Sequence, residues 1–203
     1  MANTGCVVWF TGLPSSGKTT LANLLAASLK DAEVPHRILD GDEVRLRLTK
    51  DLGFSRKDRD ENISRISYVA KLLSEVGAIA ITAAISPYRQ ARDAARAETK
   101  NFIEVYVRCD VKICIKRDVK GLYAKALDGS IGNFTGVSDP YEEPLHPDVI
   151  VETDKESPQQ SLAIILDKLR GSGLLPVADA AADRQYASDT AIVTKLKTLG
   201  YIG

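Results

Sequence analysis

The sequence predicts an α/β fold in which a five-stranded parallel sheet carries helices on both faces. Three observations lead to this prediction. Short apolar runs alternate with longer segments whose apolar residues recur at helical spacing. The central runs are apolar throughout, as in strands covered on both faces. The first junction between a strand and a helix carries a glycine-rich pattern typical of phosphate binding.

This junction fits the pattern G-x-x-x-x-G-K-[ST]. It follows an apolar run at 6–11 and precedes a helical pattern at 20–29. Glycine at both ends allows turns that point backbone N–H groups into one hollow, and the helix N-terminus adds more. We expect nucleotide binding by Gly12, Leu13, Pro14, Ser15, Ser16, Gly17, Lys18, Thr19 and Thr20.

Two side chains of this loop carry specific chemistry. Lys18 supplies a charge for the β- and γ-phosphates, and the Thr19 hydroxyl is a ligand for Mg²⁺. The alternative is a glycine turn followed by an accidental Lys-Thr pair, which the flanking strand and helix disfavour. The pattern does not say what happens to the nucleotide.

Composition limits the classes of function. The 203 residues suffice for one α/β domain, and a formal net charge of zero disfavours binding to nucleic acid through a broad basic surface. Cys6, Cys109 and Cys114 form no C-x-x-C pair, so we expect buried free thiols. We find no signal peptide and no membrane span, and therefore expect a cytoplasmic protein without a membrane partner.

The second strand is expected at 36–39 and leads into two carboxylates, Asp40 and Asp42. Ligands of open parallel sheets lie beyond the carboxyl ends of the strands, so both should lie near the glycine-rich loop. A carboxylate there can hold Mg²⁺ or accept a hydroxyl proton. For both residues the alternative is a turn that caps a helix at 43–49, and for Asp40 the residues do not decide between the two.

A polar stretch follows, in which Phe54 is a poor core candidate and could instead stack on a flat ring. Ser55 is expected to cap a helix that continues through 63–76 and ends at Gly77. Arg59 and Asn62 share one face of this helix and suit an anion with hydrogen-bonding neighbours. From this stretch alone, a solvated and salt-bridged surface is the favoured interpretation.

The next strands are expected at 78–85 and 102–107, with a helix at 90–99 between them. Ser86 follows the first of these strands, again at a carboxyl end. Asp110 is expected to cap a helix at 111–117.

Residues 118–126 are dense in cations and lead into a long loop, 128–144, rich in Gly and Pro. Such loops inside compact domains tend to be lids or binding loops, and a cationic segment there could close over phosphates. A merely flexible surface loop is an equal alternative. Phe134 lies in this polar loop and, like Phe54, is expected to be exposed unless it meets something flat.

The last strand is expected at 148–153, followed by a helix at 157–170 that Gly171 ends. We interpret 1–170 as one domain. Residues 171–203 are interpreted as a C-terminal tail with a short helix from 188 to 199, not as a separate domain.

Taken in order, these segments resemble the adenylylsulfate kinase (APS kinase) family over about residues 4–170. The resemblance is carried by FTGLPSSGKTT at 10–20, LDGDEVR at 39–45, LGFS at 52–55 with Arg59 and Asn62, ISPYR at 85–89, RDVKGLY at 117–123, and FTGV at 134–137 with PYE at 140–142.

The resemblance implies a P-loop nucleoside-triphosphate-hydrolase-like kinase fold. It also implies an enzyme of sulfate assimilation that uses ATP and Mg²⁺ to convert adenylylsulfate into 3′-phosphoadenylylsulfate (PAPS). Members of the family are commonly dimers, so the resemblance also implies that this chain could form a homodimer.

The resemblance also implies roles for individual residues. Asp42 matches the catalytic carboxylate near the 3′-hydroxyl and Mg²⁺, with Lys18 and Lys120 as the cations that face the phosphates. Arg117 matches a position near the adenine of ATP, and Thr19 with Asp42 the metal position. The matches for adenylylsulfate binding are Asp42, Arg45, Phe54, Arg59, Asn62, Ser86, Lys120 and Phe134.

Two other classes of function remain as alternatives. A P-loop kinase for another small hydroxyl substrate would share the loop and the carboxylate. A nucleotide-dependent regulatory module would bind without transfer, although the sequence has no Asn-Lys-x-Asp segment of the kind that reads guanine.

Overall fold

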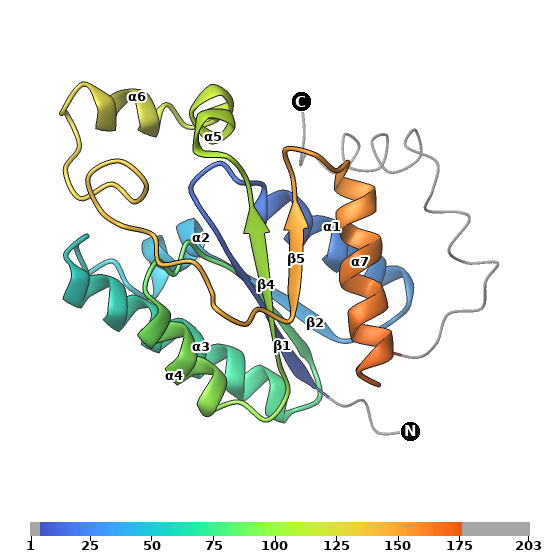
Figure 1. Ribbon diagram of the computed structural model, residues 1–203. Helices are drawn as coiled ribbons and strands as arrows, with labels where there is room; N and C mark the ends of the chain where they lie inside the picture. Colours follow the sequence, from blue (N-terminus) through green and yellow to red (C-terminus); the bar gives the residue numbers. More distant parts are fainter. Residues whose placement is uncertain (1–4, 176–203) are drawn as a thin grey trace.

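The computed structural model describes residues 5–175 and gives them a central parallel sheet between layers of helices (Figure 1). The order of the five strands is β2-β3-β1-β4-β5, and all neighbours are parallel. The strands are β1 (Cys6–Thr11), β2 (His36–Asp40), β3 (Ile79–Ala83), β4 (Phe102–Arg108) and β5 (Val149–Glu152). The predicted fold class is confirmed.

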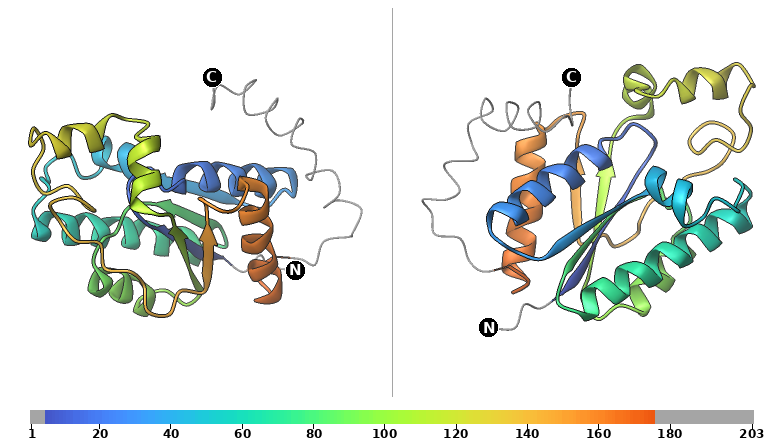
Figure 2. Two further views of the ribbon diagram at one scale, coloured as in Figure 1. Left: turned by 45° about the horizontal axis from the view of Figure 1, so that its top comes forward. Right: turned by 180° about the vertical axis from the view of Figure 1, so that it is seen from behind.

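Seven helices lie between or after these strands within the described residues. They are α1 (Lys18–Asp31), α2 (Gly41–Arg47), α3 (Arg56–Glu75), α4 (Arg89–Ala97), α5 (Val111–Arg117), α6 (Leu122–Leu127) and α7 (Pro158–Gly171). Helices α1 and α7 cover one face of the sheet and contact each other, whereas α3 and α4 pack together on the opposite face (Figure 2).

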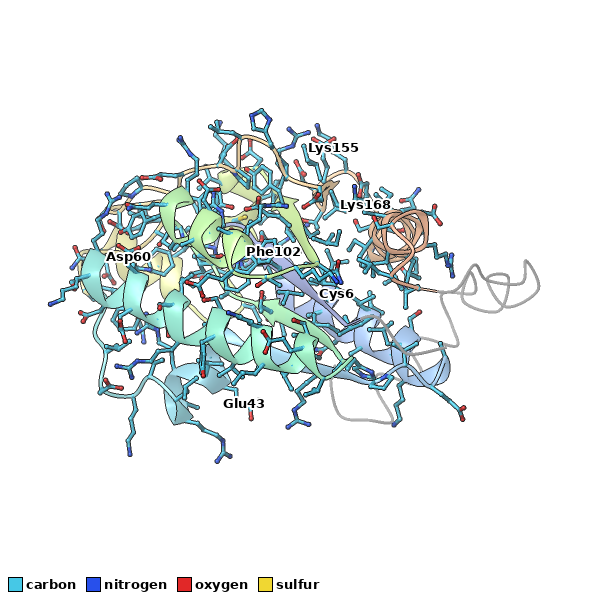
Figure 3. All side chains as sticks on the ribbon, turned by 90° about the horizontal axis from the view of Figure 1, so that it is seen from below. Cys6, Glu43, Asp60, Phe102, Lys155 and Lys168 are labelled. Carbon is cyan, nitrogen blue, oxygen red and sulfur yellow. The ribbon has the colours of Figure 1, made fainter. Side chains whose placement is uncertain are left out.

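The two faces of the sheet bury separate apolar clusters. Alternate residues of β1 point to opposite sides, so Val8 and Phe10 pack toward α1 and α7 while Val7 and Trp9 pack toward α3 and α4. Trp9 stacks on Phe102 with ring centroids 5.7 Å apart. In Figure 3 Phe102 lies near the middle of the molecule, whereas Glu43 of α2 and Asp60 of α3 lie closer to its edge.

Helix starts follow the predicted caps. The Ser55 side chain accepts a hydrogen bond from the N–H of Asp58, and that of Asp110 from the N–H of Lys112. Asp40 caps α2 by accepting from the N–H of Asp42 at 2.9 Å, so its capping interpretation is confirmed. Gly77, with a φ of 86°, follows α3 in the left-handed conformation that ends many helices.

Several boundaries differ from the sequence prediction. The predicted strand 78–85 extends only over 79–83 because the chain then turns away from the sheet toward Ser86. Helix α2 begins at 41 and not at 43, since Asp40 rather than a later residue caps it. Helix α7 includes Gly171, and the left-handed glycine is Gly173.

The segment after α5 also differs, because the cation-rich stretch contains a helix that was not predicted. Asp118 accepts hydrogen bonds at 3.0 Å from the N–H groups of Tyr123 and Ala124, which starts α6 with a carboxylate. Gly121 has a φ of 64° and makes the turn between α5 and α6.

The predicted domain limit at 170 stays a prediction. Leu174 and Leu175 are buried in the cluster formed by α1 and α7, so the chain packs against the core at least to residue 175. The helix predicted at 188–199 lies outside the described residues. No helix within 5–175 is long and apolar enough to cross a membrane.

Candidate active site

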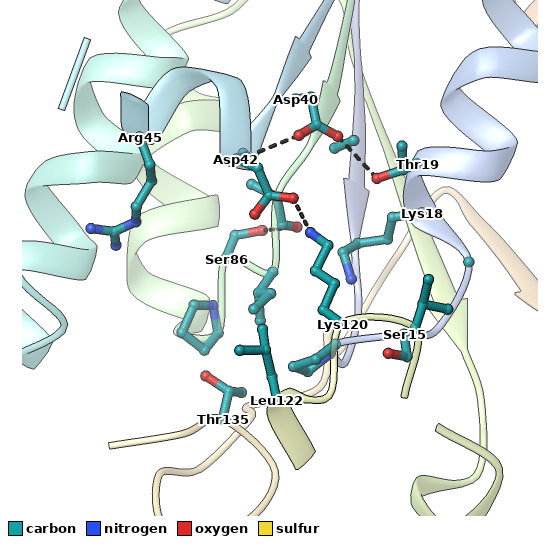
Figure 4. Close-up of a pocket in the computed structure, with 18 of the residues that line it drawn as sticks. Ser15, Lys18, Thr19, Asp40, Asp42, Arg45, Ser86, Lys120, Leu122 and Thr135 are labelled. Carbon is teal, nitrogen blue, oxygen red and sulfur yellow. Dashed lines mark hydrogen bonds and ion pairs between the residues drawn. The ribbon is translucent and has the colours of Figure 1, made fainter. Parts of the chain in front are cut away.

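A cavity of about 1180 Å³ lies beyond the carboxyl ends of β1, β2 and β3 (Figure 4). It runs from the glycine-rich loop to the start of α3 and under the loop after α6. The predicted site residues that line it are Pro14, Ser15, Gly17, Lys18, Thr19, Thr20, Asp42, Arg45, Phe54, Arg59, Asn62, Ser86, Arg117, Lys120 and Phe134. Of the predicted set, Gly12, Leu13 and Ser16 do not line it but belong to the loop itself.

Lys18 is held against this loop. Its Nζ donates to the carbonyl oxygens of Gly12 at 3.0 Å and Leu13 at 2.7 Å. Burial lowers the pKa of Lys18 to about 8, the charge of Lys120 adds to the lowering, and the carboxylates of Asp40 and Asp42 act in the opposite direction. The ammonium is therefore poorly solvated, and an anion in the loop would favour its charged form.

Thr19 and Asp40 form an oxygen-rich corner of the cavity. The Thr19 hydroxyl donates to Asp40 Oδ2 at 2.9 Å, and Asp40 Oδ1 accepts from the N–H of Asp42. Hydroxyl and carboxylate oxygens are the ligands that Mg²⁺ prefers, and it is commonly bound by one or two carboxylates together with phosphates. Within residues 5–175 there is no cluster of three or more His, Cys, Asp or Glu that could hold a metal ion.

Asp42 and Lys120 face each other across the cavity and form an ion pair (Figure 4). Asp42 stands in the first turn of α2, and Lys120 precedes α6. Both side chains are largely exposed, so this pair contributes little to stability. The geometry brings a carboxylate and a cation to the middle of the cavity, as the resemblance implies.

Phe54 is exposed by 59% and stands at the cavity rim. The guanidinium of Arg45 lies over its ring at 4.5 Å, and Arg45 also donates to the carbonyl of Gly53 at 2.8 Å. One face of an aromatic ring is therefore braced by a cation, which keeps the ring in place for another flat group.

Arg59 joins the two aromatic walls of the cavity. It donates through Nε to the carbonyl of Phe54 at 3.1 Å and through Nη2 to the carbonyl of Asn133, the residue before Phe134. Asp139 lies 3.6 Å from the same guanidinium. Arg59 is thus mostly buried and paired, in contrast to the solvated surface that the local sequence favoured.

The expectation of an exposed Phe134 is wrong. Phe134 is only 8% exposed because its ring packs edge-on against Tyr123, with centroids 5.0 Å apart, in a cluster that contains Cys109 and Cys114. It still lines the cavity. The helix α6 supplies Tyr123, and since α6 was not predicted, this partner was not foreseen.

Asn62 and Ser86 are buried in the cavity wall. Asn62 Oδ1 accepts from the Thr49 hydroxyl at 2.7 Å, which fixes the direction of the amide. Ser86 Oγ accepts from the indole N–H of Trp9 at 3.0 Å, and its backbone has a φ of 41°, unusual for a residue with a side chain.

Arg117 lies at the opposite end, next to the glycine-rich loop. It donates to Thr153 Oγ1 at 3.1 Å, and Thr153 in turn donates to the carbonyl of Ser16 at 2.7 Å. Thr153 was not foreseen as a site residue, because only its position at the carboxyl end of β5 could have indicated it. The three cysteines are buried and free, as predicted, and burial raises the pKa of Cys6 and Cys114 to about 12.

This chain is similar to known proteins over most of its length. A family model described as adenylylsulphate kinase matches residues 4–152. The adenylyl-sulfate kinase of Halothermothrix orenii is 51% identical over 171 residues, which cover 84% of this chain and 92% of that protein. A probable bifunctional SAT/APS kinase 2 of Sorangium cellulosum is 55% identical over 87% of this chain, and the matched part spans 30% of that longer protein.

A solved structure shows the same similarity in three dimensions. The Mycobacterium tuberculosis APS kinase CysC in complex with AMPPNP and APS superposes with a TM-score of 0.79 at 40% identity, covering 82% of this chain and 98% of that one.

Proposed function

Because this chain belongs to the adenylylsulfate kinase family, we propose that its cavity holds ATP on the glycine-rich loop and adenylylsulfate between Phe54 and Phe134. The chain is an ATP-dependent phosphotransferase that converts ATP and adenylylsulfate into ADP and PAPS. The single observation that carries the residue assignment is the continuity of the cavity, since one space is lined by Lys18 at one end and by Phe54, Arg59 and Asn62 at the other.

On the ATP side, the loop N–H groups and Lys18 hold the phosphates. Lys18 already points at loop carbonyl oxygens, so a triphosphate would give a buried cation a stronger partner. Arg117 borders the same end of the cavity and suits the adenine of ATP. Thr19 and the neighbouring carboxylates, Asp40 and Asp42, would hold Mg²⁺, which neutralises charge on the phosphates when bound.

On the adenylylsulfate side, Phe54 offers an exposed ring and Phe134 a packed one for the two faces of adenine. Arg45, Arg59 and Asn62 lie on the same side and suit the phosphosulfate group. Ser86 forms the floor beside them. Contacts within the chain hold these side chains in place before the substrate binds.

The transfer step depends on positioning and charge, because the γ-phosphoryl passes through a loose transition state. Asp42 lies at the centre of the cavity and orients the 3′-hydroxyl or accepts its proton. Lys120 exchanges its contact with Asp42 for a phosphate oxygen, so that two cations, Lys18 and Lys120, face the developing charge.

Product analysis tests this proposal. The purified chain is incubated with ATP, Mg²⁺ and either adenylylsulfate, a nucleoside, a sugar acid or no acceptor, and both ADP and PAPS are measured. We expect ADP release that depends on adenylylsulfate and matches PAPS formation one to one. Release with a different acceptor would favour another small-molecule kinase, and binding of ATP without any release would favour a regulatory module. The homodimer and the cytoplasmic location stay predictions.

A further inference from the structure

Arg92 is one of the largest fully buried side chains within residues 5–175, although it does not line the cavity. Its guanidinium donates to Glu104 Oε1 at 2.8 Å, to the carbonyl of Ser86 at 2.6 Å and to the carbonyl of Glu142 at 2.6 Å. Glu104 belongs to β4, Ser86 to the segment after β3, and Glu142 to the end of the long loop 128–144. One side chain on α4 therefore joins three parts of the chain.

Charge pairing explains only one of these bonds. Glu104 neutralises Arg92 and also accepts from Arg96 at 3.3 Å, while Arg96 reaches Asp148 at 2.7 Å. Lys168 also lies 4.0 Å from Asp148, so the group contains three cations and two carboxylates, and Glu104 is the carboxylate that pairs with Arg92. The two bonds to carbonyl oxygens are additional, and both acceptors lie in the segments next to the cavity.

The first acceptor, Ser86, is held from both sides. Arg92 takes its carbonyl, and the indole N–H of Trp9 donates to its hydroxyl at 3.0 Å. The left-handed φ of 41° is unfavourable for serine by itself, so these contacts keep the residue in a conformation that it would otherwise leave. Ser86 and Pro87 line the cavity, and their position defines its floor.

The second acceptor is bound to the same floor. The N–H of Glu142 donates to the carbonyl of Pro87 at 2.8 Å, and the carboxylate of Glu142 accepts from the N–H of Arg89 at 2.9 Å. Because Arg92 bonds the carbonyls of both Glu142 and Ser86, the end of the long loop is tied to the floor. The side chain therefore couples the loop that carries Phe134 to Ser86.

We propose that Arg92 is a positioning residue for adenylylsulfate, which sets the floor of its half of the cavity without touching it. This inference rests on the proposed function, since it concerns the half of the cavity assigned to that substrate. The ATP half is built from the glycine-rich loop, α1 and the residues around Thr153, none of which Arg92 bonds. Loss of the contacts of the Arg92 guanidinium should therefore change the kinetics of adenylylsulfate more than those of ATP.

Lysine is the informative replacement. Arg92→Lys keeps a cation beside Glu104, but a single ammonium on a flexible stem does not reproduce a planar fork directed at three segments. Arg96→Lys is the matched control, because Arg96 lies one turn later on α4, pairs with the same Glu104 and bonds neither Ser86 nor Glu142 in any contact seen here.

Steady-state kinetics with each substrate varied gives the main readout. We expect Arg92→Lys to lower kcat/KM for adenylylsulfate by about 10-fold to 100-fold, as for a displaced but intact site, with the KM for ATP within about 2-fold. Arg96→Lys should leave both within about 2-fold. Equal effects of Arg92→Lys on both substrates, no effect on adenylylsulfate, or the same split in Arg96→Lys would overturn the proposal.

The fluorescence of Trp9 provides a readout that does not need activity. Trp9 is the chain's one tryptophan, and its indole N–H bonds Ser86, so displacement of Ser86 should shift its emission. Arg96 lies over Phe102, the ring that stacks on Trp9, so we expect a larger shift in Arg92→Lys than in Arg96→Lys. Unaltered emission in Arg92→Lys, or an equal shift in the two variants, would contradict the inference. If Arg92→Lys does not fold, the pair Arg92→Gln with Glu104→Gln removes both charges together and takes the same tests.

These outcomes also separate the inference from the proposed function. A wild-type protein that makes no PAPS refutes the function, whatever the emission of the variant shows. A wild-type protein that makes PAPS, together with an Arg92→Lys variant of unchanged kinetics, refutes only the role of Arg92.

Discussion

Phe54 and Phe134 line one cavity but are held by different forces. Phe54 is exposed and braced by the guanidinium of Arg45, whereas Phe134 is packed against Tyr123. A ring on the surface contributes little to folding, while a packed ring contributes to both folding and binding. Substitutions at the two positions therefore distinguish the contribution of a ring to substrate binding from its contribution to stability.

Alanine at each position should show this difference. We expect Phe54→Ala to weaken adenylylsulfate binding by about 1–3 kcal/mol, the range for stacking on a base, with thermal unfolding unchanged. Phe134→Ala should weaken binding and also lower the free energy of unfolding by about 3 kcal/mol or more. Calorimetric titration and denaturant unfolding measure the two quantities. A Phe54→Ala variant with unchanged adenylylsulfate affinity would rule out the stacking role.

Asp42 is the residue for which we predict the largest effect on turnover. Its carboxylate lies at the centre of the cavity and pairs with Lys120. Asp42→Ala should lower kcat far more than it raises the KM for ATP, because the carboxylate acts on the attacking hydroxyl and not on the nucleotide. Asp93→Ala, at an exposed position on α4, is the control. Near-normal kcat in Asp42→Ala would refute the assignment.

The lowered pKa of Lys18 makes both the stability of the chain and its affinity for ATP depend on pH. Its pKa in the folded chain is about 8 against an ordinary value of 10.5, because burial disfavours the charge. Between these values the unfolded chain binds more protons at this site, so the contribution of Lys18 to stability rises as the pH rises through that window. Bound phosphates favour the charged form, so ATP binding should take up a proton above about pH 8 and weaken as the pH rises further.

Calorimetry of ATP binding at about pH 8.5, in two buffers of different ionisation enthalpy, measures this uptake directly. We expect net proton uptake by the wild-type protein and its loss in Lys18→Met. The same uptake in both proteins would assign it to another group.

At the scale of residues, the sequence predicted which side chains line the cavity better than it predicted what those side chains contact. The pattern around Lys18 and Thr19 identifies itself through spacing, and Ser86 follows a strand end. The burial of Phe134 and the carbonyl contacts of Arg59 and Arg92 depend on segments far away in the chain, such as Asn133 and Glu142. No local pattern contains that information.

At the scale of elements, Gly12 and Gly17 of the glycine-rich loop are required for different reasons. A Cβ on Gly12 would lie 2.5 Å from the backbone oxygen of Val107, whereas one on Gly17 would meet only Thr153 at 3.5 Å. Both have positive φ, 152° and 104°. Gly12 is therefore restricted by close approach to β4 as well as by conformation.

We expect Gly12→Ala to be the more harmful change. Each alanine substitution should lower the free energy of unfolding by more than about 1 kcal/mol through the positive φ, with Gly12→Ala lowering it further since backbone must shift. Thermal unfolding and ATP affinity of both variants measure this. Equal stability of the two would show that the approach of the loop to β4 is not what fixes residue 12.

Apolar periodicity predicted the strands and the long helices because it reports burial in the two layers. It did not predict α6, whose six residues are too few for a period and whose start depends on Asp118 and the turn at Gly121. Because Tyr123 lies on α6, the failure to predict this helix also explains why the contact between Tyr123 and Phe134 was not predicted.

At the scale of the whole molecule, the parallel order of the strands brings separate sequence segments to one edge. The ends of β1, β2 and β3 supply the glycine-rich loop, the pair Asp40 and Asp42, and Ser86. The sequence predicted this edge because the rule for parallel sheets applies to any chain of this class. The link that Arg92 makes between Ser86 and the loop that carries Phe134 required the three-dimensional arrangement.

The most direct test of the central claim is a crystal structure of this chain with adenylylsulfate and a nonhydrolysable ATP analogue. The account predicts the adenine of adenylylsulfate between Phe54 and Phe134, and its 3′-oxygen beside Asp42 and about 3–3.5 Å from the γ-phosphorus. Adenylylsulfate bound elsewhere, or with its 3′-oxygen turned away from the phosphates on the glycine-rich loop, would contradict it.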